Sequence, residues 1–222
     1  KIKKYYYTMN NYVITIMSNP ESVRVAKRCI KSGANHEMDI EHFEAITPQN
    51  TDLNKMMKDE GISFDGFKEK YSRLDNCVAA FLSHYSLWKL AAESSKPTTI
   101  FEHDAVLVDK IPDVHFQQCI SFGKPSYGRF NVPLYIGVGP LISKTYFPGA
   151  HAYRVSPKGA EQLIYQAKRA AKPTDVFLNI HTFPGLQEYY PWPVEARDTF
   201  TTIQKTEGCL AKHGYNGSYK II

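Results

Sequence analysis

A strand–helix–strand pattern opens the chain and constrains its fold more than any other feature. Residues 12–17 and 43–48 are apolar, β-prone segments, and residues 21–32 between them carry apolar side chains at helical spacing. Pro20 suits the first turn of that helix, and Gly33 suits its end. Two parallel strands need a crossover connection of about this length, usually a helix. The pattern therefore predicts a βαβ unit, a parallel sheet and an α/β fold.

Two acids interrupt a third apolar run, which covers residues 99–107. Glu102 and Asp104 are one residue apart, and a buried strand hardly tolerates unpaired charges. We therefore expect them at the end of the strand, beside a cleft. Carboxylates suit Mg²⁺ or Mn²⁺, which commonly take further ligands from substrate phosphates. The alternative is a turn that exposes both acids to solvent.

The remaining segments predict one domain of 222 residues. The clearest helical pattern covers 76–94, and further helices are expected at 157–171 and 175–181. Strands are expected at 134–139, 150–155 and 200–203. Residues 49–72 are expected to hold one or two short helices within a loop-rich insertion, and 109–133 to be irregular. We expect a nucleotide-binding half at about 10–108 and an acceptor-side half at about 109–222.

Charge and cysteine content narrow the class of protein. The net charge of +5 suits phosphorylated small molecules or anionic membrane surfaces, and it is too dispersed to favour nucleic-acid binding. No segment has the length of a membrane span. The four cysteines show no metal or redox spacing, which predicts reduced, buried thiols and a cytoplasmic location.

Four segments, taken in order, carry a resemblance to a known family. They are residues 12–14 with Arg24, residues 81–88, residues 100–105, and residues 149–156 with 173–177. Together they resemble glycosyltransferase family 25, the lipooligosaccharide and collagen galactosyltransferase type. Two positions depart from its usual pattern: His103 replaces an Asp between the two acids, and Ala79-Ala80 replaces a Gly-Cys pair.

The resemblance implies a GT-A-like, Rossmann-type sandwich with a central, mostly parallel sheet flanked by helices. The implied activity is metal-dependent, inverting transfer of a hexose, with Mn²⁺ or Mg²⁺ as cofactor. The donor would be a nucleotide-diphosphate sugar such as UDP-galactose or UDP-glucose, and the acceptor a saccharide or other hydroxyl compound. Lipopolysaccharide biosynthesis is the implied setting. The alternative is a non-catalytic nucleotide- or carbohydrate-binding module, which His103 within the acid motif favours.

The same resemblance assigns roles to individual residues. Asp104 is the expected direct metal ligand, Glu102 would bind the ribose, the metal or its water shell, and His181 is a possible third ligand. Asp175 is the expected base for the acceptor hydroxyl, although an acid at a helix start is often a plain N-cap. Asp198 is the second candidate for that base.

The expected donor-binding set is drawn from several elements. Its members are Ile14, Arg24, Ser83, His84, Glu102, His103, His151 and Tyr153. Each has a simpler interpretation that stays open. His84 would contact the donor or support the acid motif through Ser83, or it would be a core-edge histidine bonded to a backbone carbonyl. His151 and Tyr153 would merely pack in a strand, and Arg24 would be a solvated helix-face residue.

Overall fold

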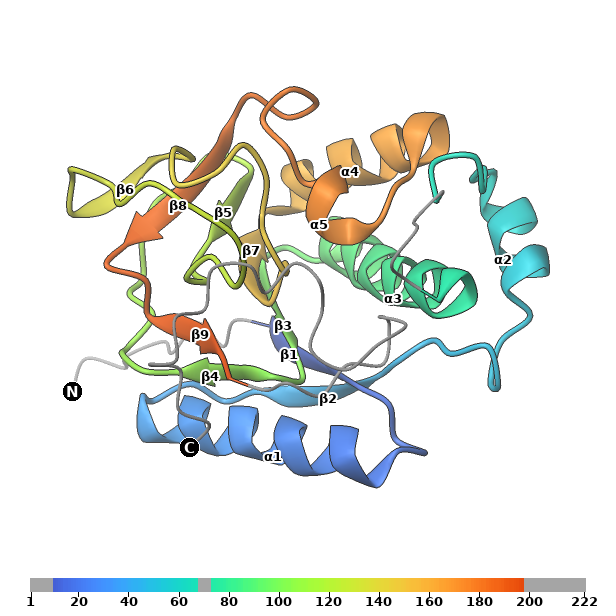
Figure 1. The fold of residues 1–222 in the computed structure, drawn as a ribbon, viewed down its shortest axis with the longest axis horizontal. Coiled ribbons are helices and arrows are strands. Elements are labelled where there is room, and N and C mark those ends of the chain that lie inside the picture. The colour runs from blue at the N-terminus through green and yellow to red at the C-terminus, as the bar shows by residue number, and fades with distance from the viewer. Residues whose placement is uncertain (1–9, 68–72, 198–222) are drawn as a thin grey trace.

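A seven-stranded sheet forms the centre of the computed structural model, which describes residues 10–67 and 73–197 (Figure 1). The order of its strands is β2-β1-β3-β7-β5-β8-β6. Their bounds are β1 (Asn10–Thr15), β2 (Glu41–Glu44), β3 (Thr98–Glu102), β5 (Cys119–Ser121), β6 (Gly137–Pro140), β7 (Ala152–Val155) and β8 (Leu186–Tyr190). A separate two-stranded sheet pairs β4 (Ala105–Leu107) with β9 (Val194–Ala196).

The predicted βαβ unit forms the parallel part of the sheet. Strands β2 and β3 both pair with β1 in parallel, so three carboxyl ends meet at one edge. Strands β5 and β8 are also parallel to each other. Strand β7 pairs antiparallel with β3 and β5, and β6 pairs antiparallel with β8. The predicted α/β class, with a central sheet flanked by helices, is confirmed.

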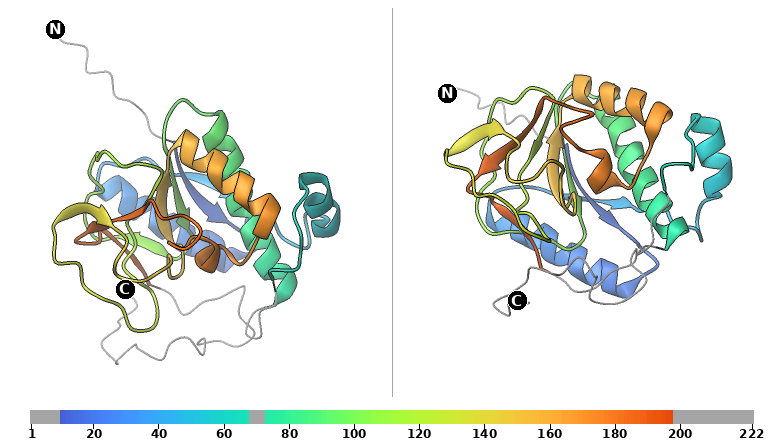
Figure 2. Two further views of the ribbon diagram at one scale, coloured as in Figure 1. Left: turned by 90° about the horizontal axis from the view of Figure 1, so that it is seen from above. Right: turned by 45° about the horizontal axis from the view of Figure 1, so that its top comes forward.

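Helices cover both faces of this sheet. Helix α1 (Pro20–Asn35) lies on one face, and α3 (Leu74–Glu93) and α4 (Pro157–Ala170) lie side by side on the other (Figures 1 and 2). Two short helices, α2 (Leu53–Glu60) and α5 (Thr174–Phe177), complete the set in the described residues. Because side chains alternate along β3, Ile100 joins the core under α3 and α4, while Phe101 joins the core under α1.

The two long helices with proline at their start begin where the sequence predicts. The Asn19 side chain accepts hydrogen bonds from the backbone N–H groups of Glu21 and Ser22, at 3.0 and 3.2 Å. Ser156 caps α4 in the same way, by accepting from Gly159 N–H at 3.0 Å. Each cap satisfies amide groups that the helix itself leaves unpaired, and a proline follows each cap.

The third apolar run differs from the prediction. It is two strands, because the chain turns at residues 103 and 104 and enters the second sheet as β4. Strand β5 lies within the segment expected to be irregular, and β8 and β9 were not predicted. The predicted strand at 200–203 and Asp198 lie outside the described residues.

Other expectations concern cysteines and membrane spans. Cys29, Cys77 and Cys119 are buried free thiols, as predicted. Among the helices of the described residues, none combines the length and the apolar character that crossing a bilayer requires.

Candidate active site

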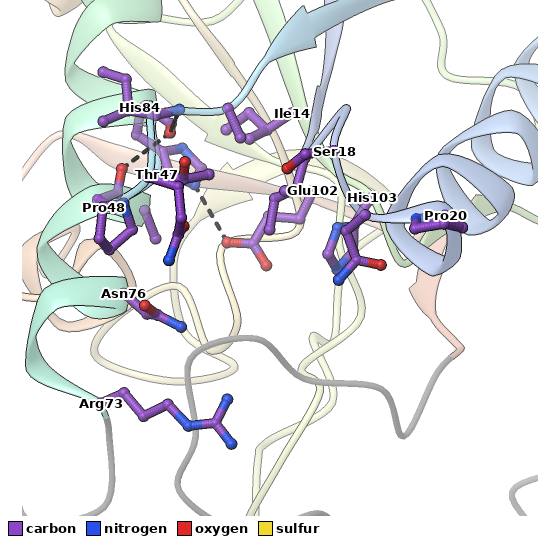
Figure 3. Close-up of a pocket in the computed structure, with 18 residues that line it drawn as sticks. Ile14, Ser18, Pro20, Thr47, Pro48, Arg73, Asn76, His84, Glu102 and His103 are labelled. Carbon is purple, nitrogen blue, oxygen red and sulfur yellow. Dashed lines mark hydrogen bonds and ion pairs between the residues drawn. The ribbon is translucent and has the colours of Figure 1, made fainter. Parts of the chain in front are cut away.

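A cavity of about 520 Å³ opens where β1, β2 and β3 end (Figure 3). Its floor includes Ile14 from β1, the 45–49 segment that follows β2, and Glu102 from β3. Ligands of α/β proteins bind outside the carboxyl ends of strands in this way. The volume lies in the range of small-molecule and cofactor sites.

Two long helices begin at this cavity. Asn19 and Pro20 from the start of α1 line one side, and Arg73 and Asn76 from the start of α3 line another. A helix start carries a partial positive charge, which favours anions. The first amides of α1 are already bonded to Asn19, whereas no side chain caps α3. In Figure 3, Arg73 and Asn76 extend from α3 on the side of the cavity opposite Pro20. The arrangement provides a polar cradle that suits a diphosphate.

Glu102 is the acid that points into the cavity, and a buried chain of hydrogen bonds holds it. Its Oε1 lies 3.2 Å from His84 Nε2, and His84 Nδ1 lies 2.8 Å from the Tyr153 hydroxyl. The Trp88 indole N–H donates to the same hydroxyl at 2.8 Å. The Tyr153 hydroxyl then donates its hydrogen bond to His84 Nδ1. Because Nδ1 accepts, the ring proton is on Nε2, which donates a hydrogen bond to Glu102.

Burial sets the charge states along this chain. His84 is 1% exposed, and desolvation lowers its pKa to about 3, so its ring is neutral at pH 7. Desolvation also raises the pKa of Glu102 to about 7, and the negative charge of Asp175 adds to that rise while His103 opposes it. Glu102 therefore changes its charge near neutral pH, as acid–base groups in active sites often do.

His103 and Ser83 line the same cavity and also hold its walls. The Ser22 hydroxyl accepts from Ile16 N–H at 2.9 Å and shares a second hydrogen bond, of 2.8 Å, with His103 Nδ1. The Ser83 hydroxyl donates to the Ala79 carbonyl and accepts from Ile46 N–H, both at 2.9 Å. Ser83 thus fastens the segment after β2 to α3, and His84 reaches Glu102 without it.

Asp175 is not among the residues that line the cavity, but its charge acts on both Glu102 and His84. Its Oδ2 accepts from the Tyr127 hydroxyl at 2.5 Å, and its Oδ1 accepts from Val176 N–H at 2.9 Å. Burial raises its pKa, while these bonds oppose the rise. The N-cap of α5 is Pro173, so Asp175 does not occupy the plain N-cap position.

The other expected site residues lie away from the cavity lining. Arg24 is exposed on α1 and forms an ion pair with Glu21 at 2.5 Å. His151 is buried, and its backbone carbonyl accepts from Glu102 N–H at 3.0 Å. Tyr153 lies in the core behind His84. His181 is exposed in the turns after α5.

Asp104 belongs to the turn between β3 and β4. Its backbone carbonyl accepts from Arg197 N–H at 3.1 Å. Burial raises the pKa of Cys29 and the charge of Asp104 adds to that rise, whereas burial lowers the pKa of His151 and the charge of Asp104 opposes that fall. Across residues 10–67 and 73–197, no three His, Cys, Asp or Glu side chains gather closely enough to hold a metal. Metal binding by Glu102, Asp104 and His181 stays a prediction.

Several cavity residues had weak sequence signals. Arg73 and Asn76 sit at the start of the clearest helical pattern, and Asn19 precedes a helix-starting proline. A search for polar residues at predicted helix starts would have found all three. Thr47 and Gln49 follow the second strand, where the same reasoning applies. Trp88 gave no functional signal, because its spacing is that of a core residue.

Comparison with known proteins agrees with this geometry. The model of glycosyltransferase family 25, described as a lipopolysaccharide biosynthesis protein, matches residues 9–131. That match covers more than half of the chain and includes β1, β2, β3 and the starts of α1 and α3. No curated protein matches the chain. The chain therefore belongs to glycosyltransferase family 25, and it is a glycosyltransferase.

Proposed function

We propose that the cavity binds the nucleotide diphosphate of a sugar donor, and that the chain transfers a hexose from it to a hydroxyl acceptor. The observation that carries this proposal is the cavity itself, at three parallel strand ends and two long helix starts, with Arg73 in its wall. Negative charge grows on the diphosphate as the glycosidic bond breaks. Fixed positive dipoles and a guanidinium stabilise that charge without reorganising.

UDP-galactose or UDP-glucose is the proposed donor, and a glycan of the lipopolysaccharide type is the proposed acceptor. The family match supports the latter. Transfer is proposed to be inverting, with Asp175 as the base. Its raised pKa makes its carboxylate a better proton acceptor, and its charge is felt at Glu102. Three buried free thiols support a cytoplasmic location.

Nucleotide binding tests the cavity directly, and two arginines make a matched pair. Arg73 lines the cavity, whereas Arg24 lies on the exposed side of α1 and pairs with Glu21. Calorimetric titration with UDP should show binding about tenfold or more weaker for Arg73→Ala, since a charge-assisted contact is lost, and unchanged for Arg24→Ala. The reverse result would place the diphosphate at the outer face of α1 and contradict the proposal.

The transfer step needs its own test. Asp175→Asn should lower turnover of the sugar donor by about 10²–10⁴-fold while UDP binding stays intact, because only the proton acceptor is lost. Proton NMR of the product shows whether the anomeric configuration inverts. Retention of configuration, or full turnover by the variant, would remove Asp175 from the role of base. UDP binding with no sugar consumed would favour the non-catalytic module.

A further inference from the structure

An exposed apolar loop stands at one end of the molecule, next to β6. Leu134 is 100% exposed and Ile136 is 84% exposed, and Val132 and Ile142 are exposed as well. Strand β6, which this loop enters, lies at the opposite end of the molecule from α2 (Figures 1 and 2). Single exposed apolar residues are common on protein surfaces, but a cluster of large ones marks an interaction site.

The loop holds these side chains outward. Tyr135, between the two most exposed residues, packs its ring over Gly139 and donates its hydroxyl proton to the Pro140 carbonyl at 2.8 Å. Asn131 N–H donates to the Ser143 carbonyl at 2.9 Å. A loop fixed in this way does not relieve the exposure of Leu134 and Ile136 by folding them inward.

A buried carboxylate fastens the base of the loop. Glu188 of β8 is 1% exposed, and its Oε1 accepts from the N–H groups of Ile142 and Ser143, both at 2.8 Å. Its Oε2 accepts from the Trp192 indole N–H at 3.1 Å. Both carboxylate oxygens of Glu188 therefore accept hydrogen bonds from within the fold, and the carboxylate does not lie at the surface.

The surroundings of the loop are cationic. Residues 114–160 contain no Asp or Glu, and outside the core they carry Lys124, Arg129, Lys144 and Lys158, of which Lys124 pairs with Glu195 at 3.6 Å. Arg129 and Lys144 line a hollow of about 700 Å³ beside the loop, together with Phe130 and Tyr146. Apolar tips flanked by cations fit the interface of a bilayer whose headgroups are anionic.

We propose that this loop docks the protein on an anionic lipid bilayer, with Leu134 and Ile136 inserted at the interface and Arg129 and Lys144 at the headgroup phosphates. Pairing with a second copy through the same face fits less well, because it would bring Arg129 and Lys144 of the two copies together. Docking would carry the cavity to a lipid-linked acceptor. That last consequence rests on the proposed function, whereas the docking does not.

Vesicle co-sedimentation of the full chain tests the docking without any turnover. Wild type should bind vesicles that contain phosphatidylglycerol about tenfold or more tightly than vesicles of phosphatidylcholine alone, and added salt should weaken that binding. Leu134→Ser/Ile136→Ser should bind at least about tenfold more weakly, because two apolar side chains are lost from the interface. Leu90→Ser/Tyr165→Ser, which removes exposed side chains from α3 and α4, should bind as wild type does.

Three results would overturn the proposal. They are no preference for anionic vesicles, unchanged binding by Leu134→Ser/Ile136→Ser, or sedimentation of wild type as a dimer that the same substitutions dissociate. The last result would assign the loop to a second copy of the chain. UDP affinity, measured separately, should be equal in all of these proteins. A failure of vesicle binding is thereby distinguished from a failure of the nucleotide cavity.

Discussion

The hydrogen-bond chain from Trp88 through Tyr153 and His84 to Glu102 determines which nitrogen of His84 carries the proton. Tyr153→Phe keeps the ring in the core but removes the hydroxyl between two buried nitrogen groups. We expect a loss of about 1–3 kcal/mol in the free energy of unfolding, since both groups lose their partner. Urea denaturation measures that loss, and ¹⁵N NMR of the histidine rings should show that the Nε2–H tautomer of His84 is no longer fixed.

Tyr165→Phe is the matched control, because that hydroxyl is on the exposed side of α4 and accepts from Arg169, at 3.2 Å. Its effect should stay within about 0.5 kcal/mol. An unchanged stability and an unchanged His84 tautomer in Tyr153→Phe would show that the buried chain of hydrogen bonds does not orient the ring.

Glu102 should make stability depend on pH. Its pKa rises from the ordinary 4.5 to about 7 on folding, mainly through desolvation. Between these values the unfolded chain loses the proton that the folded chain keeps, so the free energy of unfolding falls as pH rises. Above about pH 7 both states are ionised and the loss stops growing. Glu102→Gln removes this term, so its stability relative to wild type should increase from pH 4.5 to 7 and then level off.

His84 changes the free energy of unfolding with pH in the opposite direction. Its pKa is lowered from 6.5 to about 3, so its contribution to stability is gained as pH rises between these values. The difference between wild type and Glu102→Gln largely removes that shared contribution. Urea denaturation across pH, with a chelator present, measures the difference, and Glu161→Gln on α4 controls for the loss of a surface acid. A flat difference would mean that Glu102 titrates at its ordinary pKa.

The sequence predicts which residue types belong to the site more readily than it predicts the direction in which each side chain points. Glu102, His84, Ser83, His103 and Ile14 line one cavity. That they bind the donor stays a prediction. Asp104 and Arg24 carry suitable groups but do not line it. The direction of a side chain in the turn after β3 depends on where β4 goes next, and β4 is held by β9, about 90 residues further along. Local spacing does not contain that information.

At the scale of elements, α4 packs so closely on the chain before β5 that only glycine fits at one position. A Cβ on Gly159 would lie 2.2 Å from the Gln118 carbonyl oxygen. That oxygen already accepts from Ser156 N–H at 2.9 Å, so it is not free to move. Gly159→Ala should therefore lower the free energy of unfolding by about 1–3 kcal/mol, despite the better helix propensity of alanine.

Thermal and urea denaturation measure this cost, and Lys158→Ala is the control. Lys158 occupies the neighbouring, exposed position of the same helical turn, so its substitution should change stability by less than about 0.5 kcal/mol. A Gly159→Ala protein as stable as wild type would show that α4 shifts outward at little cost.

Long elements could be predicted and short ones could not. Helices α1, α3 and α4 each have an apolar stripe of several turns, and α1 and α4 also have a cap with a following proline. Strands β4, β5 and β9 have three residues each, too few for a period to be recognised. They are stabilised by partners from distant parts of the chain.

At the scale of the whole molecule, the order of the strands shows which part of the sheet forms from consecutive segments and which part depends on long-range contacts. The parallel unit β2-β1-β3 follows from consecutive segments, and it forms the cavity. The rest of the sheet, where parallel and antiparallel pairs mix, interleaves β7, β5, β8 and β6, which come from both sides of α4. That order depends on long-range contacts, so the sequence predicts the side of the molecule with the cavity better than the side that carries the exposed loop.

Binding at the cavity should stabilise the whole molecule, because its walls come from β1, the segment after β2, β3, α1 and α3 together. UDP at about 100 times its dissociation constant contributes about 2.7 kcal/mol, which corresponds to a rise in Tm of about 5–10 °C. Mn²⁺ alone should raise Tm little, since the described residues hold no group of three metal-binding side chains. Mn²⁺ with UDP should raise Tm more than UDP alone, because the diphosphate then supplies further oxygen ligands. Differential scanning calorimetry with and without EDTA measures these shifts. An equal shift with UDP in EDTA and in Mn²⁺ would contradict metal-assisted donor binding while leaving the nucleotide cavity in place.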